Sequence, residues 1–523
     1  MIASVSVAGE GLLADQASAL TALTADGVPA RLLAKDPTLW GPEAEAEAAV
    51  RLGWLDAIEV SWRLLPELLA LRTSLRAEGL DQVVLCGMGG SSLAPEVICK
   101  VAGLPLTVLD STHPDQVRTV VSGDLSRTVV VVSSKSGGTV ETDSQRRAFV
   151  AAFTAAGIDP ATRIIVVTDP GSPFASLAAD EGYRAVFLAD PTVGGRYSAL
   201  TAFGLVPSCL AGADVELLLD QAASVLAHLG EDANPALQLG AALGADGRDK
   251  LVLDAEASAL PGFGDWAEQL IAESTGKLGR GLLPVVVEPD APEVQWPAED
   301  VHIIRICGQT PLLGTAVQGN LGQQFLLWEY ATAVSGRLLG IDPFDQPDVE
   351  SAKIAARGLL DAQPEPAEPD FVDSAVEVYA TGGLLTGEST VFGAVEALLK
   401  AVPPQGYLSV MAYLDRLRDA HLAAVRAALA NRVHRPVTFG WGPRFLHSTG
   451  QFHKGGPPIG AFLQITGLVR QDLAVPDRPF TFGSLIAAQA AGDAKVLADH
   501  GRPVLRLHVK DPVGLGQVLK VLG

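Results

Sequence analysis

Short apolar runs of strand length recur along the chain, and most of them end at a turn rich in glycine, serine or aspartate. The clearest are 82–86, 106–110, 128–133, 163–168, 250–254, 282–287 and 301–305. Helical patterns separate many of these runs, which predicts parallel sheets covered by helices on both faces. We therefore expect an α/β fold with two doubly wound parallel-sheet domains in tandem. Ligands of such sheets bind at the carboxyl ends of the strands.

A chain of 523 residues is too long for a single core, so we expect several domains. The Pro- and acid-rich stretch near 361–370 predicts a linker, and strand-like runs at 437–441, 461–465 and 504–509 follow it. The predicted division is a helical lead-in at 1–60, sheet domains at 61–225 and 226–360, a linker at 361–372, and a mixed α/β C-terminal region at 373–523.

The formal net charge of −22 argues against nucleic acid as a partner, because no basic stripe is present to neutralise phosphates. No stretch approaches the roughly 20 apolar residues of a membrane span, so we expect no membrane partner and a cytoplasmic protein. The four cysteines lack CxxC spacing, which disfavours a zinc site. An acidic chain that binds an anion must do so with local donors.

Two glycine- and serine-rich turns follow predicted strands. In Gly87-Met-Gly-Gly-Ser-Ser, Ser92 stands where the dinucleotide fingerprint requires its third glycine, so we do not favour a nucleotide cofactor. In Ser134-Lys-Ser-Gly-Gly-Thr139, three hydroxyls can converge with free N–H groups of a helix start on one phosphate. The alternative is a capping box that involves Glu141.

Two further segments carry charged groups. Gly194-Gly-Arg-Tyr-Ser combines mobile backbone with Arg196, which suits stabilisation of developing negative charge, although a salt-bridged turn explains it equally well. In the predicted helix 266–277, Gln269, Glu273 and Lys277 recur every four residues and share one face. The alternative is a surface helix with an ordinary ion pair.

The order GMGGSSLAP, SKSGGTVET, VGGRYS, QLIAESTGK and FDQPDVESAK resembles the phosphoglucose isomerases, which carry the SIS (sugar isomerase) fold twice. The resemblance spans roughly residues 80–355. The C-terminal third resembles the isomerase half of bifunctional transaldolase/phosphoglucose isomerase proteins.

This resemblance implies reversible isomerisation of glucose 6-phosphate and fructose 6-phosphate through a cis-enediol intermediate, without a cofactor or metal, by a homodimer. Glu273 would be the base, Arg196 would stabilise the enediolate, and Lys353 would hold the substrate and assist ring opening. The residues it assigns to substrate binding are Ser91, Ser134, Lys135 through its backbone, Ser136, Thr139, Gly195, Gln269 and Gln346.

One position departs from the family pattern. Where the family has a ring-opening histidine after Gly-Gln, this chain has Gln324. We hypothesise that His453, or as a second choice His447, supplies that acid/base from the loop 447–456, and a position across a dimer interface is one arrangement that allows this. A structural histidine is the alternative. Three other functions remain open at this point: a dual phosphoglucose/phosphomannose isomerase, a non-catalytic sugar-phosphate-binding protein, and a nucleotide-dependent oxidoreductase.

Overall fold

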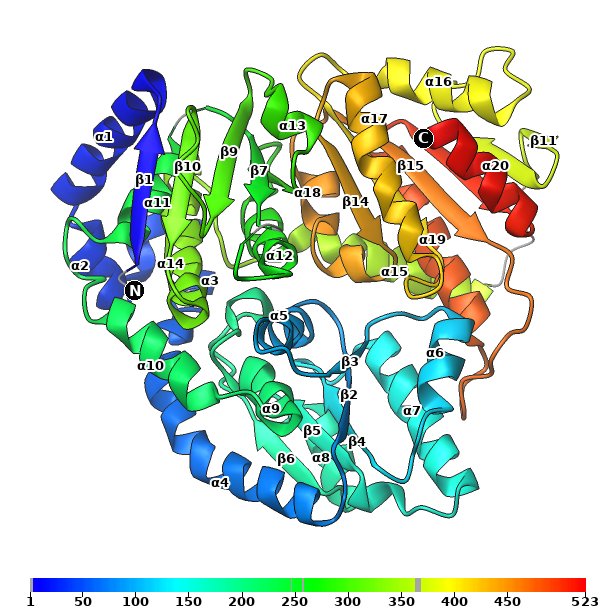
Figure 1. Cartoon of the computed structure of the whole chain (residues 1–523), viewed down its shortest axis with the longest axis horizontal. Helices are drawn as coiled ribbons and strands as arrows, with labels where there is room; N and C mark the ends of the chain where they lie inside the picture. Colours follow the sequence, from blue (N-terminus) through cyan, green and yellow to red (C-terminus); the bar gives the residue numbers. More distant parts are fainter. Residues whose placement is uncertain (1–2, 246, 256–257, 363–367) are drawn as a thin grey trace.

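The computed structural model describes residues 3–245, 247–255, 258–362 and 368–523. The described residues form three β-sheets with helices packed against them, which confirms the α/β fold class. Figure 1 shows the three sheets arranged around a centre where α12 (Phe263–Thr275) lies against α5 (Leu93–Val101). Among the described residues, no helix combines the length and the apolar character needed to cross a membrane.

The first sheet is entirely parallel and is covered on both faces. In spatial order its strands are β3 (Thr107–Leu109), β2 (Gln82–Gly87), β4 (Thr128–Ser133), β5 (Ile164–Thr168) and β6 (Ala185–Leu188). Alternate valines of β4 enter different cores: Val129 and Val131 face one, whereas Val130 and Val132 face the other. The run of apolar residues is explained by this burial on both faces.

The start of the chain forms an edge strand of the second sheet. Its spatial order is β1 (Ser4–Ala8), β10 (Gly314–Gln318), β9 (Val301–Ile306), β7 (Lys250–Asp254) and β8 (Leu283–Val287). Only β1 runs antiparallel to its neighbour, with Val5 opposite Val317. We expected only helices in the first 60 residues; residues 4–8 instead alternate serine and valine, the period of a strand with one face packed on the core.

Helices surround both sheets, and α14 (Leu321–Leu339), buried over most of its length, packs against α10 (Val215–Leu226), α11 (Pro235–Gly244) and α12. The helices of these two domains not yet given are α1 (Glu10–Ala25), α2 (Val28–Leu33), α3 (Glu45–Ala48), α4 (Ala57–Ala77), α6 (Pro114–Val121), α7 (Val140–Ala155), α8 (Pro173–Asp180), α9 (Ala202–Ala211), α13 (Pro292–Gln295) and α15 (Pro347–Ala362).

The C-terminal region forms a six-stranded mixed sheet. Its order is β11 (Phe371–Asp373), β12 (Val376–Ala380), β16 (Val504–Val509), β15 (Gly460–Gly467), β13 (Tyr407–Tyr413) and β14 (Val437–Trp441). Its helices are α16 (Val391–Ala401), α17 (Val425–Val433), α18 (Gly450–Gly455), α19 (Phe482–Asp499) and α20 (Pro512–Leu522). The predicted linker 361–372 overlaps the end of α15 and the start of β11, and its part at 363–367 lies outside the described residues.

Candidate functional site

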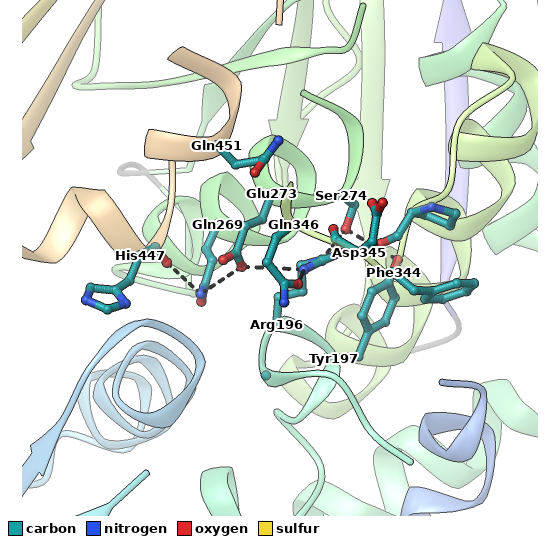
Figure 2. Close-up of polar contacts among 12 residues, drawn as sticks. Arg196, Tyr197, Gln269, Glu273, Ser274, Phe344, Asp345, Gln346, His447 and Gln451 are labelled. Carbon is teal, nitrogen blue, oxygen red and sulfur yellow. Dashed lines mark hydrogen bonds and ion pairs between the residues drawn. The ribbon is translucent and has the colours of Figure 1, made fainter. Parts of the chain in front are cut away.

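Helix α12 carries the central side chains of the candidate site. Trp266, Leu270 and Ile271 pack into the main hydrophobic core, which fixes the orientation of the helix. Gln269 and Glu273 lie one turn apart, and Gln269 Nε2 donates to Glu273 Oε2 at 3.2 Å. Figure 2 shows Glu273 between Gln269 and Arg196, with His447 beyond Gln269. The polar stripe predicted from the sequence is therefore buried rather than solvated.

Burial raises the pKa of the Glu273 carboxyl above its ordinary value, and the positive charges of Arg196, His447 and Lys353 only partly offset this effect. Glu273 Oε2 lies 3.8 Å from Arg196 Nη1. A buried carboxylate with a raised pKa is a suitable base for removing a proton from carbon next to a carbonyl group.

Arg196 is held rigidly by four hydrogen bonds, from the short helix η5 (Gly195–Tyr197) toward α12 and the segment before α15. Its Nε donates to Ser274 Oγ at 2.8 Å and its Nη1 donates to Gln346 Oε1 at 2.8 Å. Its Nη2 donates to the carbonyl oxygens of Pro343 and Asp345 at 2.7 and 2.9 Å. Arg196 as a residue is 3% exposed and its guanidinium faces Glu273, so its charge acts in a desolvated setting.

Two predicted loops touch each other beneath α12. A Cβ added to Gly90 would lie 2.0 Å from the carbonyl oxygen of Gly195, so only glycine permits this approach. Gly89, in the left-handed region at φ 54°, brings the same turn against Gln269 and the carbonyl group of His447. Ser91 ends this turn, in the short helix η3 (Gly89–Ser91), and is half-buried.

The hydroxyls of the predicted phosphate cradle gather at the start of α7. Ser134 Oγ and Thr139 Oγ1 lie 2.9 Å apart, and Ser136 Oγ accepts from the Gly138 N–H at 3.2 Å. Thr139 is the N-cap residue of α7, yet its side chain makes no capping hydrogen bond. Lys135 directs its amino group away, to Asp169 at 2.6 Å. The capping-box alternative is therefore not supported.

His447 belongs to the C-terminal region and reaches α12 within the same chain. Its carbonyl oxygen accepts from Gln269 Nε2 at 2.7 Å, and its Nε2 lies 3.2 Å from Glu141 Oε1. Burial alone would raise the pKa of the Glu141 carboxyl, but the hydrogen bond and charge of His447, a backbone hydrogen bond and the charge of Lys353 together lower it. Glu141 Oε1 also accepts from Gln489 Nε2 at 2.7 Å.

His453 has a different environment. Its Nδ1 lies 2.9 Å from Tyr407 Oη and its Nε2 lies 3.3 Å from Ser409 Oγ, and the ring stacks on Tyr407. Burial lowers the pKa of His453 well below its ordinary value. The structure thus brings His447, and not His453, together with Glu273, which reverses the preference drawn from the sequence.

Gln324 is a structural residue that ties α14 to the neighbouring strand β10. Its Oε1 accepts from Trp328 Nε1 at 2.9 Å, and its Nε2 donates to the carbonyl oxygen of Val317 at 3.3 Å. The side chain is fully buried and takes no part in the arrangement around Glu273.

The segment that leads into α15 closes the other side of the site. Gln346 is exposed and accepts a hydrogen bond from Arg196. Lys353 is also exposed, and its positive charge lowers the pKa values of Glu273 and Glu141. Lys277 is buried and bonds to the carbonyl oxygen and carboxylate of Asp345, so it shapes the segment.

Several residues at the site were not singled out from the sequence. Glu141 stands inside the cradle motif, where its spacing suggested only a cap. Gln451 donates to the Gly276 carbonyl at 2.9 Å and to Asp348 Oδ2 at 2.7 Å, joining α18 to α12 and α15. Gln489 lies more than 300 residues from its partner Glu141, and no local pattern connects them.

Comparisons with known proteins agree with this architecture, although no family profile matches the chain. A probable glucose-6-phosphate isomerase of Haloarcula marismortui is 38% identical over 214 residues, covering 39% of this chain and 49% of that protein. A probable glucose-6-phosphate isomerase of Natronomonas pharaonis is 30% identical over 339 residues, covering 54% of this chain and 79% of that protein.

The matched part spans only 40–49% of the length of the first curated relatives. Among solved structures, a glucose-6-phosphate isomerase from Chlamydia trachomatis superposes with a TM-score of 0.52 at 20% identity. That match covers 64% of this chain and 79% of the other chain. At this identity the likeness concerns the fold alone.

Proposed function

The chain belongs to the glucose-6-phosphate isomerase family, and from this premise we propose that it interconverts glucose 6-phosphate and fructose 6-phosphate. The observation that carries the proposal is Glu273, a buried carboxyl of raised pKa, next to a rigid guanidinium. Gln269 Oε1 is buried without a hydrogen-bond partner among the described residues, as expected for an acceptor that awaits a sugar hydroxyl.

The phosphate group binds first in this proposal. The hydroxyls of Ser134, Ser136 and Thr139 and the N-terminal N–H groups of α7 receive it, with Ser91 and the backbone of Lys135 alongside. The uncapped start of α7 supports this assignment, because its N–H groups are not taken by the Thr139 side chain. Binding energy from this remote group then positions the reacting carbons.

Ring opening and isomerisation follow. His447, oriented by Glu141, and Lys353 move protons between the ring oxygen and the anomeric hydroxyl of the sugar. Glu273 takes the proton from C2 of the open-chain aldose, and the C1 carbonyl becomes an enediolate. The hydroxyl proton on O2 moves to O1, and the same carboxyl returns its proton to C1, which leaves the carbonyl group at C2. Arg196, with the Gly195 backbone and Gln346, stabilises the negative charge that develops on the oxygens.

The function is tested by incubating the purified chain with fructose 6-phosphate and following the product by phosphorus NMR. We expect glucose 6-phosphate to accumulate without added metal or nucleotide. Turnover of mannose 6-phosphate in a parallel reaction would establish the dual phosphoglucose/phosphomannose activity. Binding of fructose 6-phosphate without any turnover would favour the non-catalytic alternative. The homodimer and the cytoplasmic location remain predictions.

Thr139→Val tests the phosphate cradle. The valine keeps the shape of the side chain but removes the hydroxyl beside Ser134, so we expect the KM for fructose 6-phosphate to rise about tenfold. Inhibition by inorganic phosphate should weaken by a similar factor. Thr154→Val is the control, because among the described residues that hydroxyl donates only to the Val150 carbonyl, at the far end of the same helix. Unchanged phosphate inhibition in Thr139→Val would remove this residue from the cradle.

A further inference from the structure

A cavity lies in the C-terminal region, and none of the candidate-site residues around Glu273 lines it. Its volume is about 770 Å³, within the usual range for small-molecule sites. It is bounded by α19, by the end of α15 and by β12, β15 and β16. These two helices pack against each other (Figure 1). Their approach is close, because a Cβ on Gly492 would lie 2.9 Å from the backbone nitrogen of Ala356.

The polar end of the cavity is formed by cross-strand rows. Tyr379 stands opposite Arg506, and Glu377 stands opposite His508, which is in turn opposite Thr466. Alternate residues of β16, such as Leu505 and Leu507, point into the core on the other face of the sheet. The register therefore directs a group of polar side chains to the cavity.

Arg506 has a donor without an acceptor. Its guanidinium carbon lies 4.0 Å from the centroid of the Tyr379 ring, which holds it in place. Its Nε is buried and has no hydrogen-bond partner among the described residues. Glu377 already accepts from Tyr379 Oη at 2.9 Å and lies 3.2 Å from Lys510 Nζ, so this nearest carboxylate is engaged elsewhere.

The charges and the walls define the ligand. Glu377 is paired with Lys510, so among the described residues no carboxylate lies within ion-pair distance of the lining cation Arg506, and this single unbalanced charge suits a monoanion better than a phosphate dianion. Phe480, Ile486 and several alanines supply an apolar wall that a sugar phosphate would not match. We propose that this cavity binds a small organic monocarboxylate, with its carboxylate on Arg506 and its apolar body against α19.

The cavity shares α19 with the candidate active site. Ala488 and Ala490 line the cavity, whereas Gln489 between them donates to Glu141 on the opposite side of the helix. Tyr413, another lining residue, donates to Asp493 on the same helix at 3.4 Å. A bound ligand therefore contacts the element that holds Glu141 beside His447.

Calorimetric titration of the full chain with 3-phenylpropionate and with the neutral 3-phenylpropanol tests the proposal. We expect the acid to bind about tenfold or more tightly than the alcohol, because hydrogen bonds to a charged group are the stronger ones. Arg506→Gln should abolish this preference. Lys495→Gln, which removes an exposed cation of α19 outside the cavity, should preserve it.

A second variant tests the same cavity in case Arg506→Gln fails to fold. Ala487 is exposed at the rim, so Ala487→Trp should fold and block the cavity. Hydrogen exchange should show protection of 482–499 and 504–509 by the acid. The proposal is overturned if the acid does not bind, if it binds no better than the alcohol, if the preference survives both cavity variants, or if protection falls elsewhere. None of these readouts depends on isomerase activity.

Discussion

Replacing Glu273 by glutamine should lower kcat for isomerisation by about 1,000-fold or more, with the affinity for fructose 6-phosphate nearly unchanged. The amide keeps the shape of the side chain and its contact with Gln269 but cannot accept a proton. Exchange of the C2 proton of glucose 6-phosphate with deuterated solvent should vanish together with turnover. Kinetics and NMR exchange on the same preparation measure both losses.

Glu268→Gln is the matched control on the same helix. Burial, with the nearby Asp265 charge, raises the pKa of Glu268 to about 8, so at pH 7 an amide reproduces its uncharged form. Its kcat should stay within about threefold of the unsubstituted chain. If Glu268→Gln lost as much activity as Glu273→Gln, the assignment of Glu273 as the base would fail.

The same assignment predicts a pH dependence. Glu273 works as a base only when it is deprotonated, so kcat/KM should fall as the pH drops through its pKa. Because burial raises this pKa, the acid limb should lie above the ordinary value of 4.5 for a glutamate. A profile of kcat/KM against pH measures the limb, and a limb below 4.5 would contradict the burial of a functional carboxylate.

The parallel sheets could be predicted because burial on both faces leaves a local trace. The β4 run of valines and the turn after it were visible as a strand and a ligand-binding loop without any partner strand in view. Strands β1, β6, β10, β11, β12 and β13 were not predicted. Two of them, β1 and β13, show why. The former joins a sheet about 300 residues away, and Ser409 and Met411 interrupt the aliphatic pattern of the latter.

The residues of the candidate site likewise fall into those that a local pattern indicates and those that it does not. Glu273, Arg196 and the cradle hydroxyls lie in motifs whose local spacing indicates polar groups at loop ends or on one helix face. Glu141, Gln451 and Gln489 act through contacts between segments far apart in the sequence, and a single sequence carries no signal for such pairs. His453 was favoured because it stands beside Lys454 and three glycines, yet it lies in α18 and its ring packs on Tyr407 and Phe462, in the core between the second sheet and the C-terminal region.

Replacing His447 by glutamine should slow enzyme-catalysed ring opening by about 100-fold or more. Glu141 contacts the imidazole of His447 and orients it, and Gln269 holds the His447 backbone through a hydrogen bond to its carbonyl oxygen. The interconversion of α- and β-glucose 6-phosphate requires ring opening but no proton transfer at carbon, so NMR exchange between the anomers isolates this step. Glu273→Gln should retain this exchange, whereas His447→Gln should lose it and isomerise no faster than sugar rings open spontaneously.

His453→Gln separates the two histidines. It should leave the exchange of anomers within about twofold, and it should lower the free energy of unfolding by about 1–3 kcal/mol, because Tyr407 and Ser409 lose a buried partner. Denaturant titration measures this loss. Normal exchange in His447→Gln together with abolished exchange in a folded His453→Gln would return the acid/base role to His453. That pattern would require the C-terminal region to rearrange before catalysis, since His453 is fully engaged within it.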